Sequence, residues 1–277
     1  MHWICSAAIL RGDRPTNQDQ YVVVDGAAAV LDGATSWLHT YHGPEPRDGG
    51  WYARALGAAL TARLPGHGTA LEVILDAAIA DVRDAYGLKP GDSPYSTATL
   101  VRWNTEHVDL LVLGDSPALI HHSAGTNTLI ADERLAATAP AERDAYRDHL
   151  RQGRGFDAQF ADLIAAVQRT ERHSFNQPDG FWVAEAEPTA ASHAICRTLP
   201  VDEVAALTLM TDGAAAGVID YQLTDWVGLA DELSRHGAAT WLHRIHLAEE
   251  SDPDGRRWPR TKKHDDKTTI TLTKLTS

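Results

Sequence analysis

Four aspartates follow or flank strand-like segments, and they are the residues in this chain best placed to do chemistry. Asp32 comes directly after the apolar run Ala-Ala-Ala-Val-Leu, and Asp212 comes directly after Ala-Leu-Thr-Leu-Met-Thr. Asp115 and Asp265 also stand at predicted strand edges. An Asp-Gly pair commonly forms a turn and nothing more. Position after a strand is therefore what distinguishes Asp32 and Asp212 from the other Asp-Gly pairs of the chain.

A shared cleft for these carboxylates predicts bound cations. If the strand ends meet in space, three or four like charges lie close together, and they cannot all stay ionised without a compensating positive charge. The two cysteines, Cys5 and Cys196, lie far apart, and no Cys or His spacing is typical of a zinc site. Carboxylate, carbonyl and water oxygens suit Mg²⁺ or Mn²⁺. The residues thus favour a magnesium or manganese site.

The first half of the chain predicts a hairpin, two helices and an antiparallel meander. Asp25-Gly26 is a favourable turn pair between two strand-like runs. Apolar residues spaced by three and four predict the helices, and alternating or β-branched runs predict the meander. The expected strands are 21–24, 27–31, 96–103, 108–113 and 118–121, and the expected helices are 51–64 and 70–86.

The second half predicts fewer strands and more helix. A polar region from Asp132 to about Arg172 indicates a helical insertion without a strong chemical motif. We expect strands at 181–184, 204–210 and 268–272, and one long helix over 224–248. We find no repeat or linker that divides the chain. This order of elements predicts one domain over residues 1–277, an α+β sandwich of two antiparallel sheets covered by helices, with a helical insertion or flap around 132–180.

Composition limits the classes of partner. The chain has 277 residues, 43% of them apolar, which is enough for a sizeable core, and a net charge of -13. Nucleic-acid phosphates are bound by clustered Lys and Arg, so this charge argues against a nucleic-acid partner. No basic segment followed by an apolar run opens the sequence, and no stretch approaches a membrane span. We therefore expect a cytoplasmic protein without a membrane partner.

An ordered set of short motifs runs from residue 11 to residue 272. This set of motifs resembles that of the bacterial type of the PP2C (PPM) family of metal-dependent Ser/Thr protein phosphatases. Each motif alone is weak, and the order carries the resemblance. The motifs are Arg14-Pro-Thr-Asn17-Gln18-Asp19, Val30-Leu-Asp32-Gly33, Ser96-Thr97-Ala98, Gly114-Asp115-Ser116, Thr211-Asp212-Gly213 and Asp265-Asp266-Lys-Thr268.

The resemblance implies a four-layer α/β/β/α sandwich and a centre for two Mg²⁺ or Mn²⁺ ions. By position in the motifs, Asp32 bridges the two ions, Gly33 lends a backbone carbonyl, and Asp212 and Asp265 hold the first ion. Asp115 matches the residue associated with a third, weaker metal site.

Two further residues match the family's catalytic positions. Arg14 corresponds to the arginine that clamps the phosphate, and Asp19 corresponds to the residue that orients the attacking water. The implied activity is hydrolysis of phosphoserine and phosphothreonine monoesters in proteins, with a phosphorylated protein as the partner. The sequence does not define an oligomeric state.

Three positions depart from the family pattern and keep other functions open. Gln18 stands where many members carry a metal-binding Glu, and Pro117 stands where the family usually has Arg. Ala34 replaces a histidine proposed as the general acid, so His39 and His42 are alternative proton donors. These departures motivate the rival hypothesis of a catalytically weak or inactive, phosphoprotein-binding pseudophosphatase. A small-molecule phosphatase with the same metal chemistry is a third hypothesis.

Overall fold

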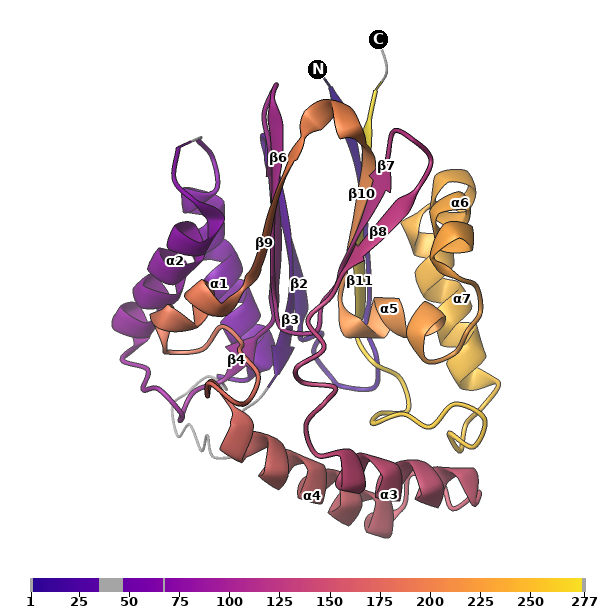
Figure 1. Ribbon diagram of the computed structural model, residues 1–277. Helices are drawn as coiled ribbons and strands as arrows, with labels where there is room; N and C mark the ends of the chain where they lie inside the picture. The colour runs from indigo at the N-terminus through magenta and orange to yellow at the C-terminus, as the bar shows by residue number, and fades with distance from the viewer. Residues whose placement is uncertain (1, 35–46, 67, 276–277) are drawn as a thin grey trace.

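The chain forms four layers, with two β-sheets packed face to face and helices on both outer sides (Figure 1). The computed structural model describes residues 2–34, 47–66 and 68–275. Within these residues the sandwich predicted from the sequence is confirmed. The first and last strands pair from Trp3 with Lys274 to Leu10 with Lys267, so the two ends of the described chain lie side by side.

Both sheets are antiparallel throughout, and each combines strands from distant parts of the chain. The first sheet has the order β2 (Asp19–Val24), β3 (Ala27–Ala34), β5 (Ala98–Trp103), β6 (His107–Leu113) and β9 (Ile195–Pro200), and β4 (Tyr95–Ser96) also pairs with β3. The second has the order β1 (Trp3–Leu10), β11 (Lys267–Lys274), β10 (Val204–Met210), β7 (Ala118–His122) and β8 (Asn127–Ile130).

Alternation along β3 explains how one strand serves two cores. Successive side chains of a strand point to opposite faces of the sheet. Ala28 and Val30 belong to the core between the sheets, whereas Ala29 and Leu31 belong to the core beneath the helices on the outer face. All four side chains are fully buried, which matches the uninterrupted apolar run in the sequence.

The helices cover the outer faces of the sheets and one end of the sandwich (Figure 1). One sheet carries α1 (Gly49–Arg63) and α2 (Leu71–Tyr86), and the other carries α5 (Asp212–Ile219), α6 (Trp226–His236) and α7 (Ala238–Glu250). The remaining pair, α3 (Pro140–Arg151) and α4 (Ala158–Ser174), lies across the lower ends of the sheets in this view. Short 3₁₀ turns occupy Pro188–His193 and Val201–Glu203.

The predicted hairpin at Asp25-Gly26 is confirmed, and two other predicted elements are wrong. The expected helix over 224–248 is interrupted at Gly237, whose φ of 79° lies in the region that favours glycine, so α6 ends there and α7 begins in a new direction. The expected strand at 181–184 forms only isolated bridges, from Phe181 to Phe175 and from Ala184 to Ser96. The sequence analysis also missed β1, β8, β9 and α5.

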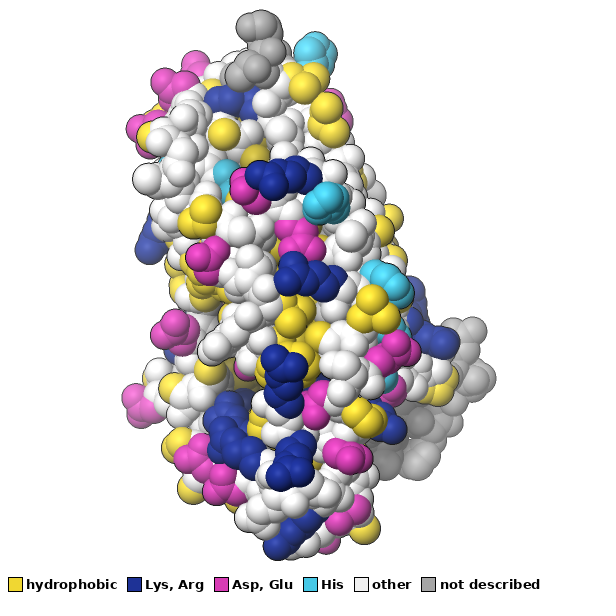
Figure 2. Space-filling view, turned by 90° about the vertical axis from the view of Figure 1, so that its right-hand side faces the viewer, with side chains coloured by type: hydrophobic (Ala, Val, Ile, Leu, Met, Phe, Trp, Pro, Cys, Tyr) yellow, Lys and Arg dark blue, Asp and Glu magenta, His cyan; other side chains and the backbone are white. Residues whose placement is uncertain are grey.

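The face of the molecule in Figure 2 carries side chains of both charges. Figure 2 looks onto the side of the molecule that carries α6 and α7, and dark-blue Lys and Arg side chains gather toward its lower end, the end at which α3 lies in Figure 1. Among the helices of the described residues, none has both the length and the apolar character needed to traverse a bilayer.

Candidate active site

The four predicted aspartates meet at the end of the sandwich opposite the chain termini. Asp32 is near the end of β3, Asp115 follows β6, Asp212 begins α5 just after β10, and Asp265 precedes β11. The carboxyl groups of Asp32 and Asp212 are in hydrogen-bonding contact. Asp115 and Asp265 each interact electrostatically with Asp212. The predicted convergence of strand ends is therefore present in the structure.

A fifth carboxylate, Asp19, lies directly beside this group. Asp19 is opposite Asp32 in the register of β2 and β3 and is 4% exposed. Thr211 Oγ1 donates a hydrogen bond of 2.8 Å to Asp19 Oδ2, and the other carboxylate oxygen, Oδ1, is buried without a hydrogen-bond partner among the described residues. A buried acceptor without a donor is costly. A water molecule or a cation fits this position.

Crowding and burial disfavour the charged forms of these groups. Loss of hydration, followed by repulsion from Asp265 and Asp212, raises the pKa of Asp19 to about 8 despite the hydrogen bond from Thr211. Loss of hydration and then the charge of Asp212 raise the pKa of Asp115 to about 7. The pKa values of Asp32 and Asp212 are raised for the same two reasons, burial first and neighbouring carboxylates second. Added positive charge therefore stabilises the cluster.

A lysine ammonium already lies against this cluster. Lys262 Nζ is 2.5 Å from Asp265 Oδ1. Burial disfavours the charged ammonium, but the carboxylates of Asp265, Asp212 and Asp32 outweigh burial and raise the pKa of Lys262. A cation thus fits between these oxygens. Carboxylate and backbone carbonyl donors are also the set that Mg²⁺ and Mn²⁺ prefer. The residues present therefore fit the divalent ions expected from the sequence.

A close contact between two glycines fixes the end of β3 that carries Asp32. A Cβ atom on Gly33 would lie 2.2 Å from the backbone oxygen of Gly49, the first residue of α1, so only glycine permits this approach. Asp48 caps α1 by accepting a 2.8 Å hydrogen bond from the backbone N–H of Trp51. Gly33 itself donates to the carbonyl of Gln18, at 3.1 Å. This contact places the N-terminus of α1 beside the cleft.

Asp266 ties the two terminal segments of the chain together at the site. Its carboxylate accepts hydrogen bonds from the backbone N–H of Gly12 at 2.8 Å and of Gln18 at 2.9 Å, and its side chain is buried. These bonds hold the segment that carries Arg14 and Asp19 against the segment that carries Asp265. The sequence analysis did not assign Asp266 this bridging role, because its partners are about 250 residues away.

The carboxylates open into a cleft of about 300 Å³ that also holds positive side chains. Arg14 lines the cleft, is exposed, and makes no ion pair within the part of the chain that the structure describes. Arg143 also lines the cleft and pairs with Glu171 at 2.5 Å. Arg143 and Glu171 were missed by the sequence analysis, because they come from two helices without a local motif. Their pairing across 28 residues gives no signal in the sequence.

Two of the three departures from the family pattern lie at the cleft. Gln18 and Ala34 line the cleft, and Gln18 is 3% exposed. Pro117 accepts a 3.0 Å hydrogen bond from the backbone N–H of Met210, so it continues the pairing of β7 with β10 while Asp115 still faces the cleft. His39 and His42, the alternative proton donors, lie outside the described residues.

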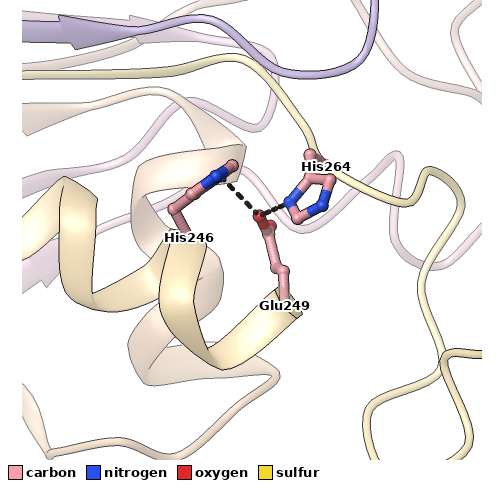
Figure 3. Close-up of side chains that lie close together, drawn as sticks. All are labelled: His246, Glu249 and His264. Carbon is pink, nitrogen blue, oxygen red and sulfur yellow. Dashed lines mark hydrogen bonds and ion pairs between the residues drawn. The ribbon is translucent and has the colours of Figure 1, made fainter. Parts of the chain in front are cut away.

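A second group of ligand-type side chains lies behind Asp265 and has a structural explanation. His246, Glu249 and His264 bring their ligand atoms within 4.8 Å of one another (Figure 3). The carboxylate of Glu249, however, is already neutralised by Lys267, whose Nζ is 2.8 Å away and whose side chain is fully buried. It also accepts hydrogen bonds from His264 at 2.9 Å and Tyr221 at 3.1 Å.

This buried ion pair helps to position Asp265. Lys267 Nζ donates a 2.7 Å hydrogen bond to the backbone carbonyl of Asp265 while it pairs with Glu249 of α7. The group in Figure 3 therefore connects α7 to the start of β11 and fixes the backbone of the segment that faces the cleft.

Comparison with solved structures places this arrangement in a known fold. No family model matches the chain, and no curated protein matches it in sequence. PppA, a regulatory component of the type VI secretion system (T6SS) in Pseudomonas aeruginosa, has 16% identity and a TM-score of 0.56, covering 99% of both chains. The Mycobacterium tuberculosis serine/threonine phosphatase PstP has 17% identity and a TM-score of 0.53, covering 98% of both. Staphylococcus aureus Stp1 has 13% identity and a TM-score of 0.57, covering 100% of this chain and 96% of Stp1.

The match covers essentially the whole chain and confirms the predicted fold class. The chain has the fold of bacterial PPM-type Ser/Thr phosphatases. At these low identities the likeness shows the fold alone. The catalytic domain of PstP has been solved in complex with two manganese ions.

We expect the stability of the metal-free protein to fall as pH rises from about 5 to about 8. The pKa values of Asp19 and Asp115, about 8 and about 7, lie above the ordinary value of 3.8. The folded state therefore keeps protons that the unfolded state releases, and the resulting stability is lost as pH rises through the folded pKa values. Urea denaturation with excess chelator at several pH values measures this slope.

Asp19→Asn keeps the shape of the side chain and removes one titrating group, so it should flatten the slope. Added Mn²⁺ should restore stability at the high end of the range. If the stability of the metal-free protein is constant or rises over this pH range, the raised pKa values of Asp19 and Asp115 are contradicted.

Lys262→Met should bind Mn²⁺ about tenfold more tightly than the unaltered protein. The ammonium of Lys262 competes with an incoming cation for Asp265, and methionine keeps the length of the side chain without the charge. Isothermal titration calorimetry measures the affinity directly. Lys263→Met is the matched control, because it removes the same charge one residue away from the Asp265 contact. Equal effects of the two variants argue against direct competition.

Glu249→Leu should destabilise the fold by about 3–5 kcal/mol, because it leaves the buried Lys267 ammonium without its partner. The double variant Glu249→Leu with Lys267→Met removes both charges and should recover most of this loss. Chemical denaturation of the metal-free proteins provides the comparison. A double variant that is less stable than Glu249→Leu alone refutes the importance of the ion pair.

Proposed function

We propose that this protein hydrolyses phosphoserine and phosphothreonine monoesters in proteins, using two Mg²⁺ or Mn²⁺ ions. The supporting observation is a cleft lined by Asp32, Asp115, Asp212 and the exposed Arg14, with the carboxylates of Asp19 and Asp265 next to this cluster. A second cation, Arg143, lines the same cleft. Carboxylates that need cations, next to a group that binds oxyanions, form a site suited to phosphate esters.

Five residues would hold the ions and one would hold the phosphate. From the resemblance of the motifs we assign the metal sites to Asp32, the backbone carbonyl of Gly33, Asp212 and Asp265, with Asp115 at a third, weaker site. When bound, the ions lower the pKa of water and stabilise charge in the displacement at phosphorus. Arg14 is exposed in the cleft, and its planar guanidinium can bind two phosphate oxygens at once.

Asp19 is the residue we assign to the attacking water. Its Oδ2 is held by Thr211 Oγ1, and its Oδ1 has no donor among the described residues. Oδ1 can therefore accept a hydrogen bond from water and fix the direction from which that water approaches.

The hydroxyl groups near the cleft are engaged in structural contacts, which favours direct attack by water. Thr97 Oγ1 accepts from the backbone N–H of Asp32 at 3.2 Å and shares a 2.6 Å hydrogen bond with Ser116 Oγ. Ser96 Oγ donates to the carbonyl of Thr97 at 2.7 Å. Among the described residues, neither Ser96 nor Thr97 has the neighbouring base that activates a nucleophilic hydroxyl. The reaction therefore needs no covalent phosphoenzyme.

The rival function, a phosphoprotein-binding module with weak or no turnover, is favoured by two residues of the cleft. Ala34 offers only a methyl group where a proton donor stands in some phosphatases of this fold, and Gln18 offers a neutral amide where many have a carboxylate. Both changes reduce catalysis more than they reduce phosphate binding through Arg14.

With Mn²⁺ or Mg²⁺, we expect the protein to hydrolyse an aryl phosphate and a phosphothreonine peptide, and excess chelator should abolish both activities. Asp212→Asn should lower kcat/KM by roughly a hundredfold or more, because it removes a charged ligand from the centre of the cluster. Steady-state kinetics measures the loss. Asp225→Asn is the matched control: Asp225 caps α6 away from the cleft, and asparagine caps a helix equally well.

Two results would contradict parts of the proposal. Full activity of Asp212→Asn excludes the assigned centre. Tight binding of a phosphopeptide without turnover at saturating Mn²⁺ supports the binding module. Faster hydrolysis of metabolite phosphates than of phosphopeptides would instead identify a small-molecule phosphatase.

A further inference from the structure

A second hollow adjoins the cleft that contains the aspartates. It has a volume of about 500 Å³ and lies between α4 and the loop that precedes Asp265. Ile164, Gln168, Thr261 and Lys262 line both this hollow and the cleft. The two depressions therefore adjoin at these four residues, and a ligand bound in the cleft can extend toward the hollow.

The walls of this hollow differ in chemistry from those of the cleft. Its apolar wall consists of Phe156, Phe160 and Ile164, with the rings of Phe156 and Phe160 packed edge to face at 5.0 Å. Phe156 and Ile164 are partly exposed to solvent. Partly exposed aromatic and aliphatic side chains beside a charged cleft are typical of a pocket that takes up an apolar side chain of a ligand.

The rim of the hollow carries charges of both signs. Asp157 caps α4 by accepting from the backbone N–H of Phe160 at 2.8 Å. Asp13 accepts from the backbone N–H of His264, also at 2.8 Å. Lys263 is exposed and makes no ion pair inside the described ranges. Because the rim is mixed in charge, the apolar wall is the feature that distinguishes the hollow from the cleft.

The dimensions of α4 set the spacing between the two subsites. Gln168 borders the cleft and Phe160 lies in the hollow, eight residues away along the helix. At 1.5 Å per residue this separation is about 12 Å. An extended peptide advances about 3.3 Å per residue, so three or four residues span the distance.

We propose that the hollow formed by Phe156, Phe160, Ala161 and Ile164 is a specificity subsite for phosphopeptides. It takes up a large apolar side chain about three or four residues from the phosphorylated residue in the cleft. The occupant is a segment of the phosphorylated substrate, because the hollow shares four lining residues with the cleft in which the phosphate would bind. This inference rests on the proposed function and adds a substrate class to it.

The test uses phosphothreonine peptides with a single Leu or Phe placed at each position from four before to four after the phosphothreonine, in an alanine background. We expect kcat/KM to be about tenfold higher for the favoured position than for the all-alanine peptide, mainly through a lower KM. Ala161→Gln should abolish this preference and leave aryl phosphate hydrolysis unchanged, because Ala161 is exposed and lines only the hollow.

Ala158→Gln is the matched control. Ala158 is also an exposed alanine of α4 but borders neither the hollow nor the cleft, so this variant should keep the preference. The same peptides can be made with phosphonate in place of phosphate, which prevents turnover. Fluorescence anisotropy in the presence of Mn²⁺ then measures their binding and repeats the comparison.

The outcomes separate the subsite from the activity. Hydrolysis of all peptides at equal rates, or a preference that survives Ala161→Gln, overturns the subsite and leaves the phosphatase intact. If no substrate is hydrolysed, the proposed activity is wrong, and binding of the phosphonate peptides then tests the subsite on its own. Tighter binding of the Leu or Phe peptide, lost in Ala161→Gln, supports the subsite, and equal binding overturns it.

Discussion

The structure depends on the confinement of several carboxylates to a space where they repel one another. Burial already raises the pKa of Asp19, Asp32 and Asp212, and each of these groups then disfavours the ionised form of its neighbours. A site of this kind costs stability, so the surrounding backbone must hold it together. Asp266 and Lys267 do so with buried hydrogen bonds to main-chain groups on either side of the cluster. Repulsion among the buried carboxylates therefore explains both why the site favours cations and why it needs a rigid support.

The sandwich fold brings these carboxylates together because each stands at the end of a different strand at the same end of the sheets. Asp32 belongs to one sheet, and Asp212 follows a strand of the other. The distance between them is therefore set by the packing of the inter-sheet core, in which Val30 and Leu209 are both fully buried. A change in that core would move one carboxylate relative to another. Core packing and metal affinity are in this sense linked.

Features set by local pattern were predictable from the sequence, whereas features that depend on distant contacts were missed. The strand-terminal positions of Asp32 and Asp212 were indicated by uninterrupted apolar runs, and the hairpin was indicated by Asp25-Gly26. The break at Gly237 was missed because a glycine inside a periodic apolar pattern is compatible with either a continuous or a divided helix. The ion pair of Lys262 with Asp265 was missed for a different reason. The neighbouring charges were visible, but only the folded loop shows that the lysine turns toward the carboxylates rather than toward solvent.

Chemistry and recognition are carried by different parts of the molecule. The carboxylates stand at strand ends, where the pairing of neighbouring strands fixes their backbone. The cations of the cleft, Arg14, Arg143 and Lys262, come from loops and from α3, outside the sheets. In a chain of net charge -13, this placement puts three cationic side chains beside the carboxylates of the cleft, where the proposed phosphorylated substrate would bind. Loops and peripheral helices generally tolerate substitution better than paired strands do, so contacts with the proposed substrate could change while the carboxylate cluster is kept. The hollow beside α4 belongs to this peripheral part of the molecule.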